Sequence, residues 1–376
     1  MEITVLKKII VSFAFFLLLM LAATHALAAS PTLLKAKQEA EAKEHIFFTT
    51  HDEIVAMAKK EGKLRVITGL EPPNYKPLMN GFRQKYPFIT DIYVEQLRSD
   101  AAQVFILEMQ SRQAKGWDIA HIVTDFAPEY PPYLKKYDIL GMAEHGVLKI
   151  HPKMIHPVER NMVSVTSAIT VVPYNRKLIS EDKVPAKWED FLKPELKGRK
   201  FVVDVRPSHI VALVPLWGLE KTLEFARKLA AQQPVWGSGT TRMNTAIAIG
   251  EYSLGSTSTF NSVKRAMGKD QTGSLSYKIV EPVPARVLEH ASAILNTADR
   301  PHAALLWLEF LASPEGQEII DKYEPFGASL YTPGSVTEQM IRGKELSVAD
   351  WDHFTKMQEY TAKIVAAFGF PKADKK

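Results

Sequence analysis

The apolar positions along the chain follow two alternating spacings, one typical of helices and one of strands. In the segment 51–60, Ile54, Val55 and Ala58 recur at a helical spacing, and Leu64–Thr68 is a short apolar run that predicts a buried strand. Strands that alternate with helices in this way indicate βαβ units and a mostly parallel sheet. The pattern therefore predicts an α/β fold.

The same spacings predict the other elements. Helices are expected over residues 33–45, 101–113, 132–140, 217–232, 241–249, 301–311, 314–323 and 349–366. Strands are expected over residues 89–94, 118–123, 200–204, 251–255, 277–282 and 291–296.

One β-type run, residues 161–173, is longer than a single sheet strand needs and predicts a crossing into a second domain. The strands at 277–282 and 291–296 are expected to flank a return crossing. Two α/β lobes joined by crossing strands form a cleft with a hinge, which suits closure around a ligand. We expect a helical extension at 29–50, a first lobe of residues 51–165 and 283–325, and a second lobe of residues 166–282 and 326–376.

The N-terminus predicts export. Lys7 and Lys8 precede an apolar run over 9–22, and Ala26-Leu27-Ala28 gives a small-x-small cleavage pattern. These features indicate a secretory signal peptide, residues 1–28, cut after Ala28. The run is shorter than the ~20 residues of a membrane span. We expect a periplasmic protein, with an uncleaved N-terminal anchor as the alternative.

Composition narrows the function. The chain has no cysteine, which excludes disulfides, thiolate metal sites and cysteine nucleophiles. The net charge of +5 is mild and no run of five or more like charges occurs, so nucleic acid is not an expected partner. No HExxH, P-loop or GxSxG motif is present. We therefore expect no enzyme, no cofactor and no metal ion.

Several segments resemble one known family. They are Ala58–Leu64, Val172–Arg176 with Trp188–Leu192, Gly250–Tyr252, and Pro301–Ala304 with Phe310–Gln317. In this order they resemble the class II periplasmic solute-binding proteins of ABC transporters, of the iron-binding type. The resemblance implies a two-lobed Venus-flytrap fold, a site in the cleft between the lobes and a membrane permease as partner. We expect the protein to be a monomer.

The chain departs from the ferric-binding members of that family. Those members hold iron through two adjacent tyrosines roughly ten residues beyond the Gly-Glu pair, where this chain has Phe260 and Asn261. A ferric ion needs anionic oxygen ligands, so the loss of both phenolates disfavours iron. A metal site without tyrosines, using carboxylates and a bound anion, stays open as an alternative.

Ligands of such folds contact the loops that follow the carboxyl ends of strands. An arginine beside a helix start suits a carboxylate or phosphonate, and small hydroxylated residues with glycines let backbone amides approach an anion. Plain turns and helix caps are the alternative reading of each loop. The candidate ligand-binding residues are Glu71, Tyr75, Arg98, Ser99, Asp125, Arg206, Ser208, Ser238, Thr240, Thr241, Thr257, Thr259 and Phe260.

The function predicted from the sequence is capture of a small anionic or zwitterionic organic solute, which a membrane permease then accepts. A periplasmic sensor or adaptor for a membrane signalling partner is the alternative with the same fold.

Overall fold

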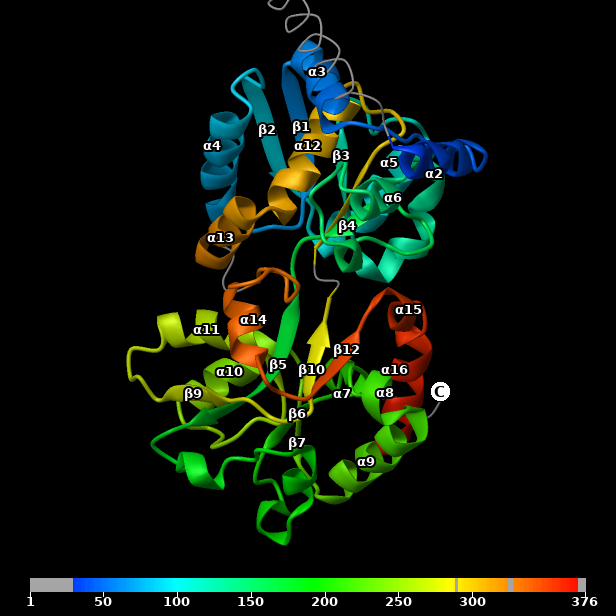
Figure 1. The fold of residues 1–376 in the computed structure, drawn as a ribbon. Coiled ribbons are helices and arrows are strands. Elements are labelled where there is room, and N and C mark those ends of the chain that lie inside the picture. The colour runs from blue at the N-terminus through cyan, green and yellow to red at the C-terminus, as the bar shows by residue number, and fades with distance from the viewer. Residues whose placement is uncertain (1–29, 288–289, 324–326, 371–376) are drawn as a thin grey trace, which may run out of the picture.

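The computed structural model describes residues 30–287, 290–323 and 327–370, which form two α/β lobes joined by extended segments (Figure 1). The expected signal peptide, residues 1–28, lies outside the described residues. Within the described part of the chain, no helix has the length and apolarity that a bilayer crossing requires.

The first lobe is built on a five-stranded sheet in the order β2-β1-β3-β11-β4. Strand β1 runs parallel to β2 and β3, and β11 pairs antiparallel with β3 and β4. The strands are β1 (Lys63–Thr68), β2 (Asp91–Gln96), β3 (Ile119–Ile122), β4 (Met162–Ser164) and β11 (Ala291–Ile294).

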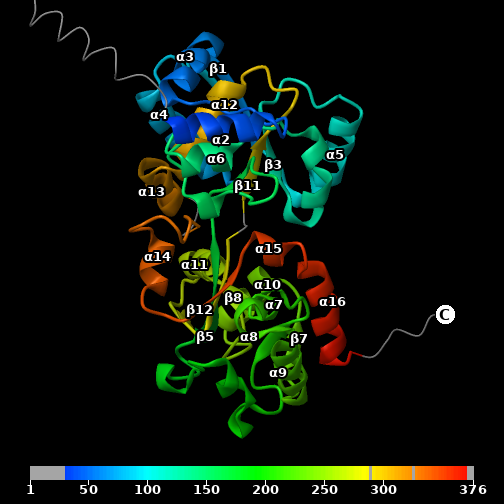
Figure 2. The ribbon, with the colours of Figure 1, turned by 45° about the vertical axis from the view of Figure 1, so that its right-hand side comes forward.

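Helices pack around this sheet (Figures 1 and 2). They are α2 (Pro31–Glu41), α3 (His51–Glu61), α4 (Tyr75–Lys85), α5 (Ala102–Gln110), α6 (Ile139–Glu144), α12 (Pro301–Ala312) and α13 (Pro314–Tyr323). Local chemistry sets the bounds of α3, because the Thr50 side chain accepts the N–H of Glu53 and Gly62 ends the helix at φ 65°. Helix α12 is buried along almost its whole length and fixes α3 to the sheet.

The second lobe contains a sheet in the order β12-β10-β5-β8, with β9 also paired to β5, and a parallel pair β6-β7. The strands are β5 (Ala168–Asn175), β6 (Val202–Asp204), β7 (Val235–Gly237), β8 (Ser258–Thr259), β9 (Leu275–Lys278), β10 (Val283–Arg286) and β12 (Leu346–Ala349). Its helices are α7 (Ser208–Val211), α8 (Val214–Trp217), α9 (Leu219–Ala231), α10 (Thr240–Ala248), α11 (Phe260–Lys269), α14 (Val336–Ile341), α15 (Trp351–Phe354) and α16 (Met357–Phe368).

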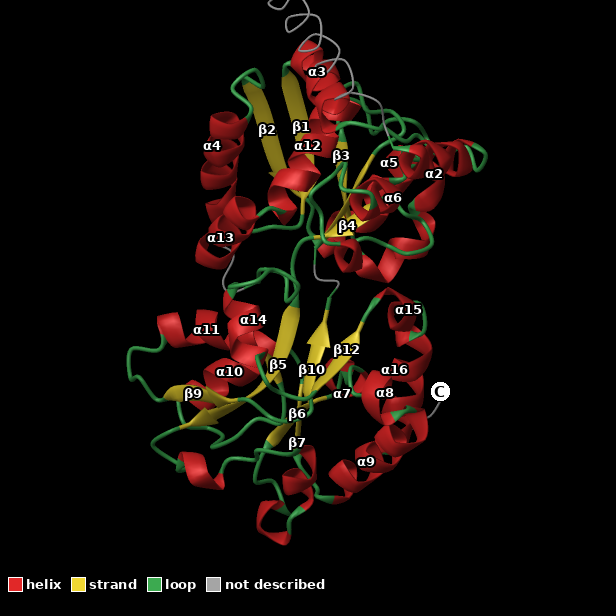
Figure 3. Cartoon of the chain, in the orientation of Figure 1, coloured by secondary structure: helices red, strands yellow, loops and turns green. Residues whose placement is uncertain are grey.

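Loops connect the helices and strands (Figure 3), and several of these connections contain short 3-10 turns. They lie at Pro72–Asn74, Ser99–Ala101, Thr124–Glu129, Pro131–Tyr133, Pro152–Met154, Glu181–Lys183, Trp188–Leu192 and Pro194–Leu196. Two of them, Ser99–Ala101 and Thr124–Glu129, come after the carboxyl ends of β2 and β3, where the sequence places candidate ligand-binding residues.

The chain passes between the lobes three times. The first passage runs from β4 into β5, the second from β10 into β11, and the third from α13 into α14. Hydrogen bonds tie these passages together, because Ser167 N–H donates to the Gly327 carbonyl and the Ser164 hydroxyl donates to the Val287 carbonyl at 2.7 Å. The lobes are therefore joined by three neighbouring passages of the chain, an arrangement typical of a hinge.

Three sequence expectations require correction. Residues 132–140 do not form one helix, because the segment begins in the 3-10 turn Pro131–Tyr133 and α6 starts only at Ile139. Residues 251–255 do not form a strand, and only isolated bridges join Leu254 to Tyr174 and Gly255 to Val202. The expected lobe boundary at residue 283 falls before β10, but β10 pairs with β5 and β12 of the second sheet. The second passage therefore begins after Arg286, because strand pairing with residues far away in sequence decides to which lobe a strand belongs.

Candidate ligand-binding site

The face of the second lobe that looks toward the first contains a hollow of about 360 Å³. The hollow lies where the loop after β6, the start of α10, the first turns of α11 and the end of β10 meet. It is lined by Asp204, Arg206, Ser208, His209, Thr240, Thr259, Asn261, Ser262, Arg265 and Arg286. We refer to it below as the arginine pocket.

Three guanidinium groups give the arginine pocket its charge. They belong to Arg206 in the loop after β6, Arg265 on α11 and Arg286 at the end of β10. The Arg206 side chain lies beside the buried Asp204, with its Nε and one terminal nitrogen each 3.4 Å from the carboxylate, and its backbone N–H donates to the same carboxylate at 2.9 Å. These contacts hold the loop after β6 against the pocket wall while the Arg206 side chain stays largely exposed.

Helix α11 and its N-cap supply two hydroxyl groups and one side-chain amide to the pocket. The Thr259 side chain caps the helix by accepting the N–H of Ser262 at 3.3 Å, and its own hydroxyl donates to the Ser262 hydroxyl at 2.7 Å. Asn261 and Arg265 are four residues apart and so share one face of the helix, next to Ser262. The positive end of the helix dipole and the Arg265 side chain therefore lie on the same side of the pocket.

A histidine forms part of the pocket wall. His209 is buried, and its Nδ1 lies 3.0 Å from the Thr170 hydroxyl on β5. Burial, together with the charges of Arg286 and Arg206, lowers the pKa of His209 to about 3. The imidazole is therefore neutral at physiological pH and offers a hydrogen-bonding ring without a further charge.

The first lobe reaches the arginine pocket through Glu71. This residue follows β1, and its carboxylate lies 3.6 Å from the guanidinium of Arg265, with both side chains nearly half exposed. Tyr75, one turn further on, donates its hydroxyl to the Leu70 carbonyl at 3.0 Å. The pair of Glu71 and Arg265 shows that the pocket opens onto the cleft between the lobes.

The structure brings part of the predicted set together. Arg206, Ser208, Thr240 and Thr259 line the arginine pocket, and Glu71 faces it from the first lobe. In contrast, Arg98 is exposed beside Asp100, at 3.6 Å, and lines none of the hollows described here.

The remaining candidates lie elsewhere. Thr257 and Phe260 are buried, and Phe260 packs edge-on against Tyr277 with ring centroids 5.2 Å apart. Thr241 is exposed on α10. The side chains of Ser99 and Asp125 lie outside the described part of the structure, although their backbones follow β2 and β3 as expected. The assignment of all these residues to a ligand stays a prediction.

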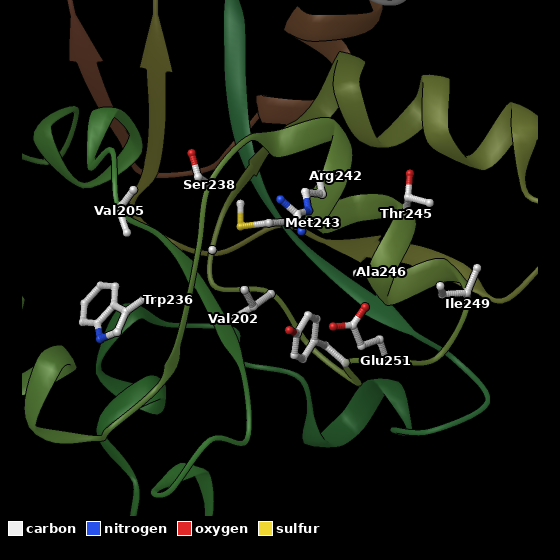
Figure 4. A pocket seen from close by; sticks show the side chains of 12 residues that line it. Val202, Val205, Trp236, Ser238, Arg242, Met243, Thr245, Ala246, Ile249 and Glu251 are labelled. Atoms are coloured by element: carbon white, nitrogen blue, oxygen red, sulfur yellow. The ribbon is translucent and has the colours of Figure 1, made fainter.

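Ser238 lines a different and larger hollow of about 590 Å³ (Figure 4). This second hollow lies between β7, α10 and the segment around Tyr252, and its lining includes Trp236, Arg242 and Glu251. The residues that line it all belong to the second lobe. The smaller arginine pocket is also lined by second-lobe residues, but its Arg265 lies 3.6 Å from Glu71 of the first lobe.

Sequence reasoning missed six residues of the arginine pocket, namely Asp204, His209, Asn261, Ser262, Arg265 and Arg286. A helix after Thr259 was not predicted, although Thr259 and Ser262 have the spacing of a cap and Asn261 and Arg265 that of one helical face. No local signal marks Arg286, because its position depends on the pairing of β10 with β5.

Metal-ligating side chains do not gather at this site. Among the described residues, no group of three His, Asp or Glu side chains is placed to hold a metal ion. The pocket groups are mostly cationic or neutral, which suits an anion better than a bare cation.

Two α/β lobes joined by three passages, with a cationic pocket facing the cleft, define a two-lobed periplasmic binding protein. Comparison with protein families agrees with this class. Residues 141–357, more than half of the chain, match the bacterial extracellular solute-binding protein family. The chain belongs to that family.

Solved structures share the fold at low identity. The Trichodesmium protein IdiA (FutA), in complex with iron and citrate ligands, is 15% identical, with a TM-score of 0.64 over 82% of this chain and 100% of that chain. Ferric iron-binding protein A of Mannheimia haemolytica in an open conformation is 15% identical, with a TM-score of 0.63 over 82% of this chain and 98% of that chain.

A substrate-binding protein of an ABC transporter from Agrobacterium tumefaciens is 16% identical, with a TM-score of 0.59 over 81% of this chain and 95% of that chain. A search of the curated proteins gave no match. Since all these identities are near 15%, the structural similarity establishes the fold and leaves the ligand to be argued from this chain's own residues.

Proposed function

We propose that this protein is the solute-binding component of an ABC importer, and that it captures a small organic solute with an anionic group in the cleft between its lobes. The observation that carries this proposal is the arginine pocket, in which Arg206, Arg265 and Arg286 converge beside the first turn of α11. The closed form, with the solute enclosed, is the form that a membrane permease would accept.

The chemistry of the pocket favours an oxyanion. Guanidinium groups donate paired hydrogen bonds that match carboxylate, phosphonate and sulfonate oxygens. The hydroxyls of Ser208, Thr240 and Ser262 are able to donate to the remaining oxygen lone pairs. Closure of the lobes removes water from the pocket, and the lower effective dielectric constant strengthens each of these interactions. A solute that binds both walls stabilises the closed state by its difference in affinity for the two states.

The position of the pocket relative to the hinge supports the transport role. Arg286 is the last residue of β10, immediately before the second passage between the lobes, and Thr259 pairs with Thr170 on β5, the strand that follows the first passage. A ligand held by these residues is therefore close to both passages, so its binding is able to bias the hinge.

The test is a binding measurement on the secreted chain, residues 29–376, with Arg265→Gln and a matched control. Arg242→Gln is the control, because Arg242 is also an exposed arginine of the second lobe but lines the other hollow. Thermal shift against carboxylates, phosphonates, sulfonates and ferric citrate identifies the binding class. Isothermal titration then measures affinity in each variant.

We expect Arg265→Gln to weaken anion binding by about 10- to 100-fold, the equivalent of a lost charge-assisted hydrogen bond. Arg242→Gln should change the affinity less than about 2-fold. Equal effects of the two substitutions would show that the ligand does not bind in the arginine pocket. Stabilisation by the iron salt alone, with no response to organic anions, would replace this function by metal binding.

A further inference from the structure

The two walls of the cleft carry opposite charges where they approach each other. The second lobe presents the guanidinium of Arg265, and the first lobe presents the carboxylate of Glu71 at 3.6 Å from it. Both side chains remain nearly half exposed, so solvent and a small molecule have access to each of them.

The loop that carries Glu71 is built to hold this residue in place. The Glu71 carbonyl accepts the backbone N–H of Asn74 at 3.0 Å and the side-chain amide of Asn74 at 3.1 Å. Asn74 is completely buried, and Glu71 itself begins the 3-10 turn Pro72–Asn74. The backbone of Glu71 is thus fixed by the body of the first lobe, and two prolines directly after it restrict the loop further.

Binding of an anion to Arg265 changes the charge that surrounds the Glu71 carboxylate. An oxyanion that accepts hydrogen bonds from Arg265 brings negative charge next to the carboxylate, and closure of the lobes then places two like charges in a poorly solvated cleft. The Glu71 carboxylate therefore repels a purely anionic solute and weakens its binding. In a solute that also carries an ammonium group, this group takes the place of Arg265 as the positive partner of the Glu71 carboxylate.

We propose that Glu71 binds the cationic group of the solute and so selects zwitterions, with the oxyanion in the arginine pocket and an ammonium group on the first lobe. This inference deepens the proposed function and rests on it. Since Arg265 and Glu71 are only 3.6 Å apart, one molecule with about two to three bonds between its charged groups reaches both side chains.

The test uses three pairs of probes that differ only by the amine: β-alanine and propionate, taurine and ethanesulfonate, and 2-aminoethylphosphonate and ethylphosphonate. Affinities for all six are measured by titration calorimetry in the native secreted chain, in Glu71→Gln and in Glu251→Gln. Glu251 is the matched control, because it is an exposed acid that lines the other hollow of the second lobe. Melting temperatures confirm that each variant is folded.

One of the three pairs carries the oxyanion that the pocket prefers. In the native protein and in Glu251→Gln, we expect the amine-containing member of this pair to bind at least about 10-fold more tightly than the amine-free member, because it makes one more charged hydrogen bond. In Glu71→Gln, this preference should fall below about 3-fold, through weaker zwitterion binding and unchanged or tighter anion binding.

Three results would overturn the inference. Equal affinity for both members of a pair, with loss of binding in Arg265→Gln, would leave the arginine pocket as the anion site and reject the role of Glu71. An equal loss for zwitterion and anion in Glu71→Gln would make Glu71 a structural or positioning residue. Failure of all six probes and of other organic anions to bind would reject the proposed function together with this inference.

Discussion

The side-chain oxygen of Gln317 accepts the backbone N–H of Ser329 at 2.7 Å and thereby joins α13 to the third passage between the lobes. The same buried amide donates to the carbonyl of Val165 on the first passage at 2.9 Å and to the Leu311 carbonyl at 2.7 Å. The Thr332 hydroxyl also donates to its oxygen. One side chain of the first lobe therefore holds two of the three passages in position.

Replacement of Gln317 by leucine should lower the free energy of unfolding by about 2–4 kcal/mol, because several buried backbone groups lose their partner at once. Urea denaturation measures the change. Gln103→Leu, at an exposed position of α5, serves as the control and should stay within about 0.5 kcal/mol of the native protein. A Gln317→Leu protein as stable as the control would show that water satisfies these groups.

Gly69 should not tolerate a side chain. A Cβ atom there would lie 2.5 Å from the ring of His121 and 2.6 Å from the Nδ1 of His290, which belongs to the second passage. The His121 ring cannot shift freely, because its Nδ1 also lies 3.1 Å from the Ala291 carbonyl. We expect Gly69→Ala to destabilise the protein by about 1–3 kcal/mol through overpacking.

Gly268→Ala is the matched control for this substitution. Gly268 lies in α11 with nothing within 4 Å of an added Cβ, so alanine there should be neutral or stabilising by up to about 1 kcal/mol. Differential scanning calorimetry of the two variants compares them directly. A Gly69→Ala protein with the melting temperature of Gly268→Ala would contradict the packing of the two imidazoles against the loop after β1.

Acid should weaken the fold through buried histidines. Burial lowers the pKa of His121 and of His209 to about 3 each, with the charge of His290 contributing at His121 and those of Arg286 and Arg206 at His209. In the unfolded chain a histidine titrates near 6.5, so between about pH 6.5 and pH 3 the unfolded state binds more protons than the folded state. The free energy of unfolding therefore falls as the pH is lowered through this range.

The contribution of His209 is measurable by urea denaturation at pH 7 and pH 5. Replacement of His209 by asparagine, which keeps a polar group near Thr170, should remove about 1–2 kcal/mol of the loss of stability between these two pH values. His145→Asn provides a comparison at an exposed histidine of the first lobe. An unchanged pH dependence in His209→Asn would mean that this imidazole is protonated in the folded state.

A buried carboxylate should stabilise the first lobe. Glu309 on α12 is 2% exposed, accepts the Lys149 N–H at 2.7 Å and lies 2.8 Å from the Nε2 of His51. Burial raises the pKa of Glu309, but the hydrogen bonds from His51 and Lys149 outweigh this effect and leave its pKa below the usual range. The hydrogen bond to Glu309 in turn raises the pKa of His51.

Glu309→Gln should lower the free energy of unfolding by about 1–3 kcal/mol near neutral pH, because the amide keeps the volume but loses the charge that holds His51. Glu318→Gln, at an exposed position of α13, should have little effect. Thermal unfolding of both variants tests the difference, and equal melting temperatures would show that the pair contributes nothing to stability.

Much of the fold was predictable from local sequence. The periodicity of 51–60 and the glycine after it predicted α3, and the apolar run 64–68 predicted β1, each within about one residue of the observed bounds. The alternation of helices and strands also gave the α/β class, which the family match and the solved structures confirm. These features depend on contacts between near neighbours in the chain, so the local sequence carries them.

Site residues could be predicted from the sequence only where they lie in loops after strands or at the starts of helices. Arg206, Ser208, Thr240 and Thr259 follow strands or begin helices, and their residue types suit an anion, so their loops could be chosen from sequence. Arg265 and Arg286 sit inside a helix and at the end of a strand, where an arginine is usually a solvated surface residue.

By itself, therefore, the sequence determined the periodic elements, the α/β class, the expected export and the family resemblance. Only the tertiary structure decided that β10 belongs to the second lobe, that three arginines distant in the chain share one pocket, and that Glu71 faces them across the cleft. The physical reason is that helix and strand periodicity reports burial along a single element, whereas the convergence of side chains depends on how distant strands pair and how two lobes meet.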